Sequence, residues 1–420
     1  THAYELYNQN GTTVNANLEA LFGAFHSDES FNQAGNRQAG SSAWQEGYAK
    51  YGLAGTQALA ASGTLYGALS LVSSATWGDG DAAGLTLGDE RRTAIEDMNL
   101  GWRSGNLFPA LGEDGIDLSG GRQVVTLGDG FLIQGDPVNL GKADLGANFN
   151  RGGAYYLAAR KAFDRTAVLR LGGKQGWRGD LMWLKSDNHY QADTALAVAN
   201  LEHVADTGTV GLSWIRGLDV DDRYAQLMGL QHRDGMDTVS LRGRGNLGVE
   251  GLEVAAEYVT QDQTGGHENA WYLEGNWTFS GLPWSPTATY RYSRFSEGFD
   301  PLCYGLSRGY GTWFQGEVAA NYAGPFNKNS QVHHVAVKGK PRDNLTVGAL
   351  FFDFDTLDTA RGDLGGRELD LYAEWMVNDH LLISPVVGFY KPGRSAANGG
   401  TQLGGRDTGT YLQLVVGTFF

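Results

Sequence analysis

The chain lacks the features that would build a helical membrane protein or a disulfide-bonded one. Its 420 residues include a single cysteine, Cys303, so no internal disulfide can form. No run of about 18 apolar residues is present, which excludes a spanning helix. A membrane barrel stays possible, because its strands need only about 9–11 alternating residues. The first residues, Thr1-His2-Ala3-Tyr4, do not form a secretory signal.

Positive charge is also in short supply. There are 32 Lys and Arg against 47 Asp and Glu, a formal net charge of −15, which argues against nucleic acid as a partner. The acidic balance suits polar loops that face water above a membrane. Glycine, in contrast, is abundant: the 62 glycines are about twice the usual share of roughly 7%. This content fits tight turns and crowded strands better than helices.

The most informative segment is residues 412–420, LQLVVGTFF. Successive side chains of a strand point to opposite faces, so one face of this segment carries Leu412, Leu414, Val416, Thr418 and Phe420. Chain ends usually fray, and a complete amphipathic strand with a terminal aromatic is unusual in a soluble domain. A barrel in a bilayer needs a complete last strand, because an unpaired edge in lipid leaves backbone groups unsatisfied. The ending therefore predicts an outer-membrane β-barrel.

The same period of two recurs along the chain. It is clear in residues 14–25, 239–244, 252–259, 271–279 and 368–375. In a barrel, the apolar face of each strand contacts lipid and the polar face lines a wet lumen. A soluble β-sandwich gives the same alternation with the faces exchanged, so the alternation alone does not separate the two folds.

The lengths of the connections favour the barrel. Short links near 61–63, 340–343 and 378–380 alternate with long ones, at roughly 26–44, 77–92, 127–151, 217–236, 296–330, 356–366 and 391–407. Short periplasmic turns and long extracellular loops are typical of outer-membrane barrels. We predict an all-β fold class: a transmembrane antiparallel up-and-down β-barrel of about 18 strands. Residues 313–322 are assigned to a loop to keep the strand number even, and residues 1–420 form a single domain.

Aromatic residues gather near the expected strand ends, which suggests the girdles that mark both membrane interfaces. They are Tyr48, Tyr51, Trp102, Tyr155, Tyr156, Trp284, Tyr290, Tyr292, Tyr390, Phe419 and Phe420.

Three motifs, in this order, resemble the alginate-export family of outer-membrane porins. They are GRQ at 121–123 with GDG at 128–130, FQGEVAAN at 314–321, and GFYKPG at 388–393. The opening YELYNQNG at 4–11 also resembles the start of general porins. The resemblance implies a monomeric barrel of 18 strands, with a channel narrowed by inward loops. It also implies a lumen lined with arginines that draws a polyuronate outward.

The chain departs from that family where the resemblance would place basic residues, namely at Ile95, Val124, Gln315, Ser384 and Val386. A track for a polyanion needs cations at close spacing, because an exposed charge is screened within roughly 8–10 Å. We therefore predict a channel (porin) for passive passage of small hydrophilic solutes or saccharides, with weak selectivity or a cation preference. The alternative is an exporter of an acidic exopolysaccharide such as alginate.

Two other classes remain open, an outer-membrane enzyme and a barrel with a blocked lumen. The sequence contains no nucleophile elbow, zinc-type histidine pair or phosphate-binding glycine loop, so we expect no enzyme. The expected partners are outer-membrane lipid, lipopolysaccharide and the transported solute.

Charged side chains in the strands are expected to line the pore, because facing lipid at mid-depth costs Arg or Lys about 2–4 kcal/mol. The alternative is that they form ion ladders which rigidify the wall. The predicted pore-lining residues are Arg103, Arg160, Arg178, Arg242, Arg244, Arg291, Glu19, Glu46, Asp97, Glu253, Glu257, Glu274, Asp353, Asp370 and Glu374.

The loop at 127–151 is long enough to fold inward as a constriction, although it could equally be an external loop. The loop at 296–330 is the second candidate for a plug or gate. The predicted constriction residues are Arg122, Asp129, Asp136, Lys142, Asp144 and Arg308. The acidic turn at 78–81 could take Ca²⁺ or bridge lipopolysaccharide. It lacks the full oxygen set of a calcium loop, so a solvated turn is favoured and no cofactor or metal is predicted.

Overall fold

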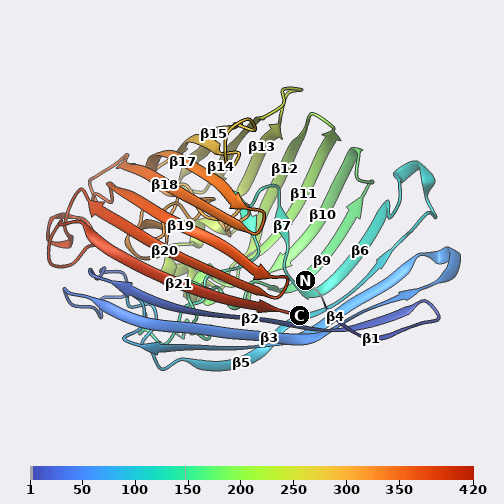
Figure 1. Ribbon diagram of the computed structural model, residues 1–420, viewed down its shortest axis with the longest axis horizontal. Coiled ribbons are helices and arrows are strands. Elements are labelled where there is room, and N and C mark those ends of the chain that lie inside the picture. The colour runs from blue at the N-terminus through green and yellow to red at the C-terminus, as the bar shows by residue number, and fades with distance from the viewer. Residues whose placement is uncertain (1–2, 147) are drawn as a thin grey trace.

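The computed structural model describes residues 3–146 and 148–420, so Thr1, His2 and residue 147 lie outside it. Eighteen antiparallel strands close into a tilted ring (Figure 1), which confirms the predicted barrel. The ring consists of β2 (Thr12–Ser27), β3 (Ser42–Ala58), β4 (Thr64–Gly78), β5 (Arg91–Arg103), β6 (Ile116–Gln123), β9 (Phe163–Leu171), β10 (Gly176–Lys185), β11 (Ala195–Ala205), β12 (Gly208–Asp219), β13 (Asp237–Gly245), β14 (Leu252–Gln263), β15 (Gly266–Thr278), β16 (Thr287–Phe295), β17 (Ser330–Arg342), β18 (Leu345–Thr356), β19 (Gly366–Asn378), β20 (Leu381–Pro392) and β21 (Gly409–Phe419).

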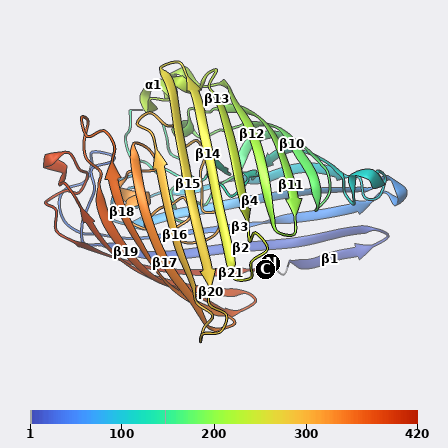
Figure 2. The same ribbon diagram turned by 90° about the horizontal axis from the view of Figure 1, so that it is seen from above.

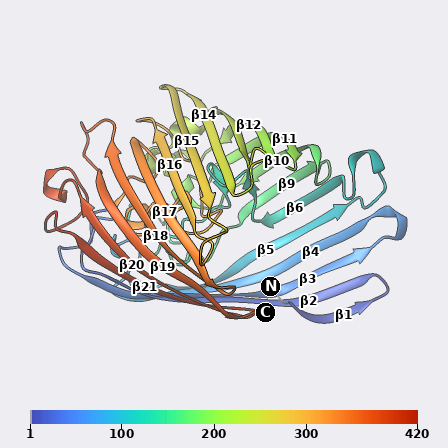
Figure 3. The same cartoon turned by 45° about the horizontal axis from the view of Figure 1, so that its top comes forward.

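The ring closes where β2 pairs with β21, which places the first and last strands of the ring side by side (Figure 1). Leu18 and Phe420 exchange two backbone hydrogen bonds of 2.8 Å. Beyond this point β2 continues past the end of β21, and its free edge is covered by β1 (Tyr4–Gln9), which lies beside β2 in Figure 3. Unpaired strand edges are a liability that proteins cover. The sequence pattern begins near residue 12 and does not reveal this extra strand.

The two ends of the barrel differ in the length of their connections. At one end the turns are short, as at 206–207, 343–344 and 379–380. At the other end lie the long loops 28–41, 79–90, 124–162, 186–194, 220–236, 296–329, 357–365 and 393–408, and one tight turn at 264–265. Seven of these loops were predicted, and 186–194 was not. Residues 313–322 lie in the loop 296–329, as expected.

The described loops and turns contain only short helices and one small hairpin. The hairpin of β7 (Thr126–Leu127) and β8 (Ile133–Gln134) lies inside the ring (Figure 1). The helices are η1 (Ala60–Ser62), η2 (Pro109–Leu111), η3 (His189–Gln191), α1 (Asp222–Met228), η4 (Gln231–Arg233), the π-helix η5 (Ala319–Ala323) and η6 (Ala396–Asn398). Across the described residues, no helix is both long and apolar enough to cross a membrane.

The outer face of the ring is an apolar belt. Figure 2 shows the long neighbouring strands of this wall. Leu241 and Leu273 are more than half exposed, whereas their neighbours Ser240 and Tyr272 are buried on the inner side. Other exposed members of the belt are Leu69, Met98, Leu100, Leu181, Leu212, Val335, Leu371 and Leu412. Soluble proteins rarely expose apolar patches of more than a few hundred Å², so this face is built for lipid.

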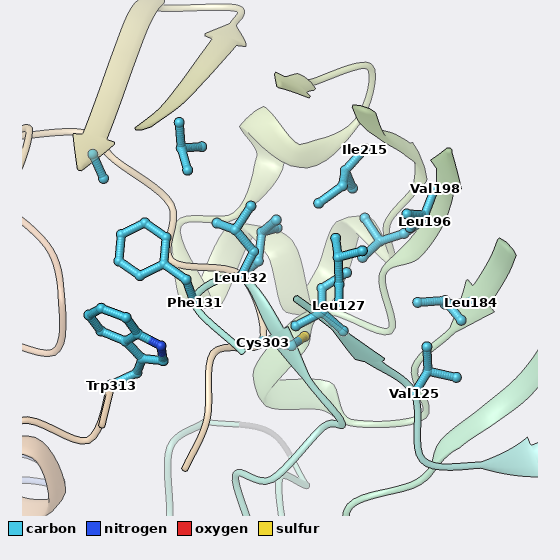
Figure 4. Packing of buried hydrophobic residues seen from close by; sticks show 14 of the residues in the cluster. Val125, Leu127, Phe131, Leu132, Leu184, Leu196, Val198, Ile215, Cys303 and Trp313 are labelled. Carbon is cyan, nitrogen blue, oxygen red and sulfur yellow. The ribbon is translucent and has the colours of Figure 1, made fainter. Parts of the chain in front are cut away.

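The buried apolar residues lie inside the ring, where loops pack against the wall. One group, shown in Figure 4, joins Leu127 and Leu132 of the loop 124–162 to wall residues such as Leu184 and Val198. A second group joins Tyr322 of the loop 296–329 to Trp44 and Tyr411 of the wall. The lumen is therefore partly filled by two ordered loops, and these position the candidate site.

Candidate functional site

The loops 124–162 and 296–329 meet inside the barrel and are fixed to its wall by aromatic contacts. The indole of Trp313 lies 4.6 Å from the ring of Phe131 and 4.5 Å from that of Tyr272 on β15, centre to centre. Its Nε1 donates a hydrogen bond of 3.1 Å to the carbonyl of Asp129. Figure 4 shows Trp313 and Phe131 facing each other. These contacts hold both loops in the lumen. For the loop 124–162, the sequence had left an inward and an external position open.

A first cluster of charges joins both loops to the wall. Arg308 of the loop 296–329 donates to Glu274 of β15 at 2.6 Å, and Arg291 of β16 lies 3.3 Å from the same carboxylate. Arg308 also approaches Asp129 of the other loop at 3.4 Å. The structure thus brings together four residues that the sequence had assigned to the pore wall and to the constriction.

A second cluster lies where the loop 124–162 meets β5 and β6. Arg122 contacts Asp187 at 2.8 Å and Glu96 at 3.8 Å, and Arg160 lies 3.5 Å from Glu96. Arg151 lies 3.3 Å from Asp187. Burial favours the neutral carboxyl of Asp187, but the three arginines outweigh it and lower its pKa. Burial and the two neighbouring guanidinium groups lower the pKa of Arg160 to about 10.

Glu96 was missed by the sequence analysis because of a β-bulge. The register between β4 and β5 shifts between Leu69 and Leu71, opposite Glu96 and Asp97. A bulge places two successive residues against one, so it breaks strict alternation. Both carboxylates therefore lie on the inner side, and Asp97 accepts a hydrogen bond of 2.7 Å from Ser70. The sequence contained one sign of the bulge: strict alternation would have exposed the carboxylate of Glu96 to lipid.

Most of the other predicted wall residues lie on the inner face in pairs. Glu202 contacts both Arg178 and Arg242 at 2.7 Å. Arg103 lies 3.6 Å from Asp117, and Arg244 pairs with Glu253. Hydrogen bonds from uncharged side chains reach three of the other acids: Glu19 accepts from Tyr48, Glu46 from Trp44 and Glu257 from Ser240. The lumen wall thus carries paired charges of both signs.

A third cluster consists of buried acids without a contacting cation among the described residues. Glu368 of β19 accepts backbone hydrogen bonds from Val318 and Ala319 at 2.7 and 2.9 Å. Asp370 accepts from the backbone N–H of Glu317 at 3.2 Å. The Glu317 carboxylate itself accepts from the hydroxyl of Tyr156. Burial, assisted by the charge of Glu368, raises the pKa of Glu317 to about 8, which favours the protonated form of this loop side chain.

The position of Asp353 differs from the prediction. Its neighbours Phe352 and Phe354 fill the inner face of β18 and are fully buried, so Asp353 points outward and pairs with Arg367 at 3.5 Å. It lies near the long-loop end of its strand, beyond the exposed Phe351, where an outward charge meets headgroups and not hydrocarbon. The sequence placed it inside because aromatic residues were assumed to face lipid.

The predicted constriction residues lie in different places. Asp136 is fully buried and accepts from Ser186 and Asn188, so it joins the loop 124–162 to the loop 186–194. Lys142 is exposed and pairs at 3.0 Å with Asp89 of the neighbouring loop. Asp144 is exposed and accepts from the backbone of Gly146. The last two therefore belong to the outer part of the loops, away from the Glu274 cluster.

The acidic turn at 78–81 offers no open set of oxygen ligands. The buried Asp81 carboxylate accepts hydrogen bonds from the N–H groups of Ala83, Leu85 and Thr86 and from the Thr86 hydroxyl. Asp79 accepts from the N–H of Ala43. These donors occupy the oxygens that Ca²⁺ would need, which fits the favoured interpretation as a turn.

At least three cavities lie inside the barrel among the described residues. The largest, of about 820 Å³, is polar and is lined by Arg244, Glu253, Asn276, Thr289, Lys338 and Glu374, with Arg308 and Tyr310 of the loop 296–329. A second, of about 510 Å³, is lined by Asp117, Arg170, Lys174, Arg178 and Glu202. The third, of about 200 Å³, lies between the two loops and is lined by Val124, Tyr155, Tyr156, Lys161, Leu306, Phe314 and Glu317.

Several aromatic residues expected in the girdles are inside the barrel instead. Tyr155 and Tyr156 belong to the loop 124–162 and line the smallest cavity, and Tyr48 and Tyr390 are buried on the inner face. Tyr290 and Trp284 are exposed, as a girdle requires. The sequence could not separate the two groups, because rings are good strand formers on either face.

A closed ring, an apolar outer belt and a lumen lined by paired charges define an integral outer-membrane β-barrel. Solved structures share this fold over the whole length of the chain. OccK7 (OpdD) of Pseudomonas aeruginosa has a TM-score of 0.58 and 12% identity, over 97% of this chain and 98% of that one. OccAB4 of Acinetobacter baumannii has a TM-score of 0.58 and 10% identity, over 96% and 98%. OccD3 (OpdP) of Pseudomonas aeruginosa has a TM-score of 0.56 and 12% identity, over 100% and 93%.

These neighbours are outer-membrane porins with a barrel of 18 strands. No family model matches the chain, and neither does any curated protein. The comparisons thus agree with the predicted fold and give no support to the alginate-export family in particular.

Proposed function

We propose that the protein is a passive outer-membrane channel for small hydrophilic solutes. The observation that carries the proposal is the polar cavity of about 820 Å³ inside a closed barrel. Cavities of about 300–1,000 Å³ accommodate small organic molecules. Its threonine, asparagine and charged side chains can hydrogen-bond a solute that sheds part of its water. The porins with the same fold are channels and not enzymes, and no catalytic activity is proposed here.

The route we propose runs from the long-loop end, through the space between the two inward loops, into this cavity. The narrowest part is then the cavity of about 200 Å³ that Tyr156, Lys161 and Leu306 help to line. Burial lowers the pKa of Lys161. With one cation and the neutral Glu317 at this point, the constriction filters mainly by size.

The proposed selectivity is weak, because cations and anions alternate along the wall. Arg178, Arg242 and Glu202 form one such group, and Arg244 and Glu253 another. In both groups each charge has a partner of opposite sign close by, which keeps the local field weak. The sequence left two roles open for these charges, filtering of solutes and stiffening of the wall, and we propose that they serve both.

Solute flux into liposomes tests the proposal. Purified protein is reconstituted, and the uptake of monosaccharides, disaccharides, small organic acids and polyuronates is compared with protein-free liposomes. We expect uptake to fall with solute size and to depend little on charge. Absence of uptake for every solute, with the barrel folded and inserted, contradicts the proposal.

Export of an acidic polysaccharide remains the second candidate in this assay, although no comparison favours it. Two of the positions where its basic track was expected hold Ser384, which shares a hydrogen bond with Tyr310, and the buried Val386. Selective passage or binding of polyuronate would restore it. We also propose that the barrel acts as a monomer, which light scattering in detergent checks.

A further inference from the structure

Two pairs of like charges face each other across neighbouring strands on the outside of the barrel. Arg367 of β19 lies directly opposite Lys391 of β20, and Arg165 of β9 lies opposite Lys185 of β10. Like charges directly opposite each other destabilise a sheet. Such a pairing is unfavourable unless a nearby anion, of the protein or of a ligand, compensates it.

Both pairs face outward, and both lie at the long-loop end of their strands. In the Arg367–Lys391 pair the adjacent residues, Glu368 and Tyr390, are buried on the inner side. Two residues nearer the middle of each strand, Leu369 and Phe389 are exposed members of the apolar belt. The pair therefore lies at the upper border of the belt, which is the level of the headgroups in the outer leaflet.

The pair is only partly compensated by the protein. The side chain of Arg367 is 71% exposed and has one carboxylate partner, Asp353, at 3.5 Å. Among the described residues, Lys391 has no carboxylate within 4.0 Å. In the other pair, Arg165 contacts Asp164 at 3.3 Å and Lys185 lies 3.8 Å from Asp219. Arg367 and Lys391 are thus the less compensated of the two pairs.

We propose that Arg367 and Lys391 bind a phosphate on an anionic glycolipid of the outer leaflet, whose acyl chains cover Leu369 and Phe389. A guanidinium binds phosphate through two parallel hydrogen bonds, and a lysine adds a point charge. The exposed apolar residues directly beside the cations fit a ligand with a phosphate head and a hydrocarbon body, and not a free anion. The inference requires the proposed membrane orientation but no solute transport.

The experiment compares lipid binding by native mass spectrometry of the full chain in detergent. The probe is lipid A, an acylated disaccharide, with two phosphates, with one, or with none. We expect the wild-type protein to retain the diphosphorylated form, and retention to fall as phosphates are removed. The double variant Arg367→Gln/Lys391→Gln should bind it about tenfold more weakly, the loss typical of a charge-assisted hydrogen bond.

A matched control removes the same charge elsewhere. Lys340→Gln/Arg342→Gln changes two exposed cations at the short-turn end of β17 and should leave binding unchanged. Equal binding by wild type and by the Arg367/Lys391 variant, or retention of the phosphate-free lipid as strong as that of the diphosphorylated one, overturns the proposal. Displacement of the lipid by inorganic phosphate at similar concentration would contradict a lipid as the ligand.

The conductance of both variants should equal that of the wild type, because the pair lies outside the lumen. An absence of conductance in all three proteins with intact lipid binding would contradict the channel and leave the lipid site standing.

Discussion

Individual inward charges were predictable because lipid excludes them. Alternation correctly gave Arg291 and Glu274 an inner position, and the structure adds that they share one cluster with Arg308. Alternation failed at Glu96, where a bulge adds a residue to one strand, and at Asp353, where phenylalanines fill the inner face. The two errors have different origins: strict alternation assumes that the register never shifts, and the assignment of faces assumes that aromatic side chains contact lipid.

Arg308 is the residue whose removal should change selectivity most. In Arg308→Ala, Glu274 keeps only Arg291 as a contacting cation, and Asp129 loses its guanidinium partner. Net negative charge beside the largest cavity should raise cation selectivity. The reversal potential in a salt gradient measures this, with a shift toward cations as the expected result.

Arg361→Ala provides the control for this change. It removes the same charge from an exposed position in the loop 357–365 and should leave the reversal potential unchanged. Equal reversal potentials in Arg308→Ala and the wild type would mean that the Glu274 cluster does not face the path of the ions.

At the scale of elements, strands were easier to predict than loops. A strand in a barrel repeats every two residues, and residues 271–279 or 368–375 reveal their faces directly. The loops 124–162 and 296–329 have no such period. The sequence predicts that both are long, but it places the first at 127–151, shorter than it is, and leaves its direction open. Contacts between residues that are far apart in the sequence direct them inward, such as those of Trp313 with Phe131 and Tyr272.

Trp313 should therefore be the main anchor of the loop 296–329. Trp313→Ala leaves a cavity between the two loops, and replacing a buried tryptophan by alanine typically costs about 3–5 kcal/mol. The hydrogen bonds between strands hold the barrel wall without Trp313. The loss of stability should therefore be confined to the two inward loops. Hydrogen exchange of the amides at 308–318 should become faster while exchange in the wall strands stays the same.

Trp177→Ala is the matched control, since this tryptophan is 67% exposed on the outside of β10. It should leave loop exchange unaltered. Unchanged exchange at 308–318 in Trp313→Ala would show that the loop is held by other contacts.

The packing of the loop 296–329 against the barrel wall should become less stable at alkaline pH. Glu317 has its pKa raised from 4.5 to about 8 by burial, so the folded loop holds this proton more tightly than an unfolded one. The stabilisation is complete below about pH 4.5 and is lost as the pH rises through about 8. Between about pH 6.5 and 9 the loop should lose about 2 kcal/mol at most.

Hydrogen exchange of residues 314–323, corrected for the intrinsic effect of pH, measures this loss. Glu317→Gln keeps a hydrogen-bonding side chain against Tyr156 without a titrating group, so its pH dependence should be weaker. The same pH dependence in Glu317→Gln and the wild type would assign the effect to another group.

For the whole molecule, closure was predictable from the last strand and the parity of the connections. An amphipathic final strand needs a partner, and β2 supplies it. The extra strand β1 was not predictable, because it depends on how far β2 extends beyond β21. The way in which two loops divide the lumen into separate cavities follows only from the assembled barrel.

The most direct test of the account concerns the path between the two inward loops. Leu306 is exposed and lines the narrow cavity, so Leu306→Cys places a thiol in the proposed path. The native Cys303 is buried and its pKa is raised by burial, which keeps it unreactive. Arg361→Cys, in an exposed loop, is the control that reacts without lying on the path.

Single-channel current in planar bilayers is recorded before and after a charged, water-soluble thiol reagent is added. We expect discrete current steps that fall sharply on modification of Leu306→Cys and stay constant for Arg361→Cys. Complete modification of Leu306→Cys with an unchanged current would contradict it.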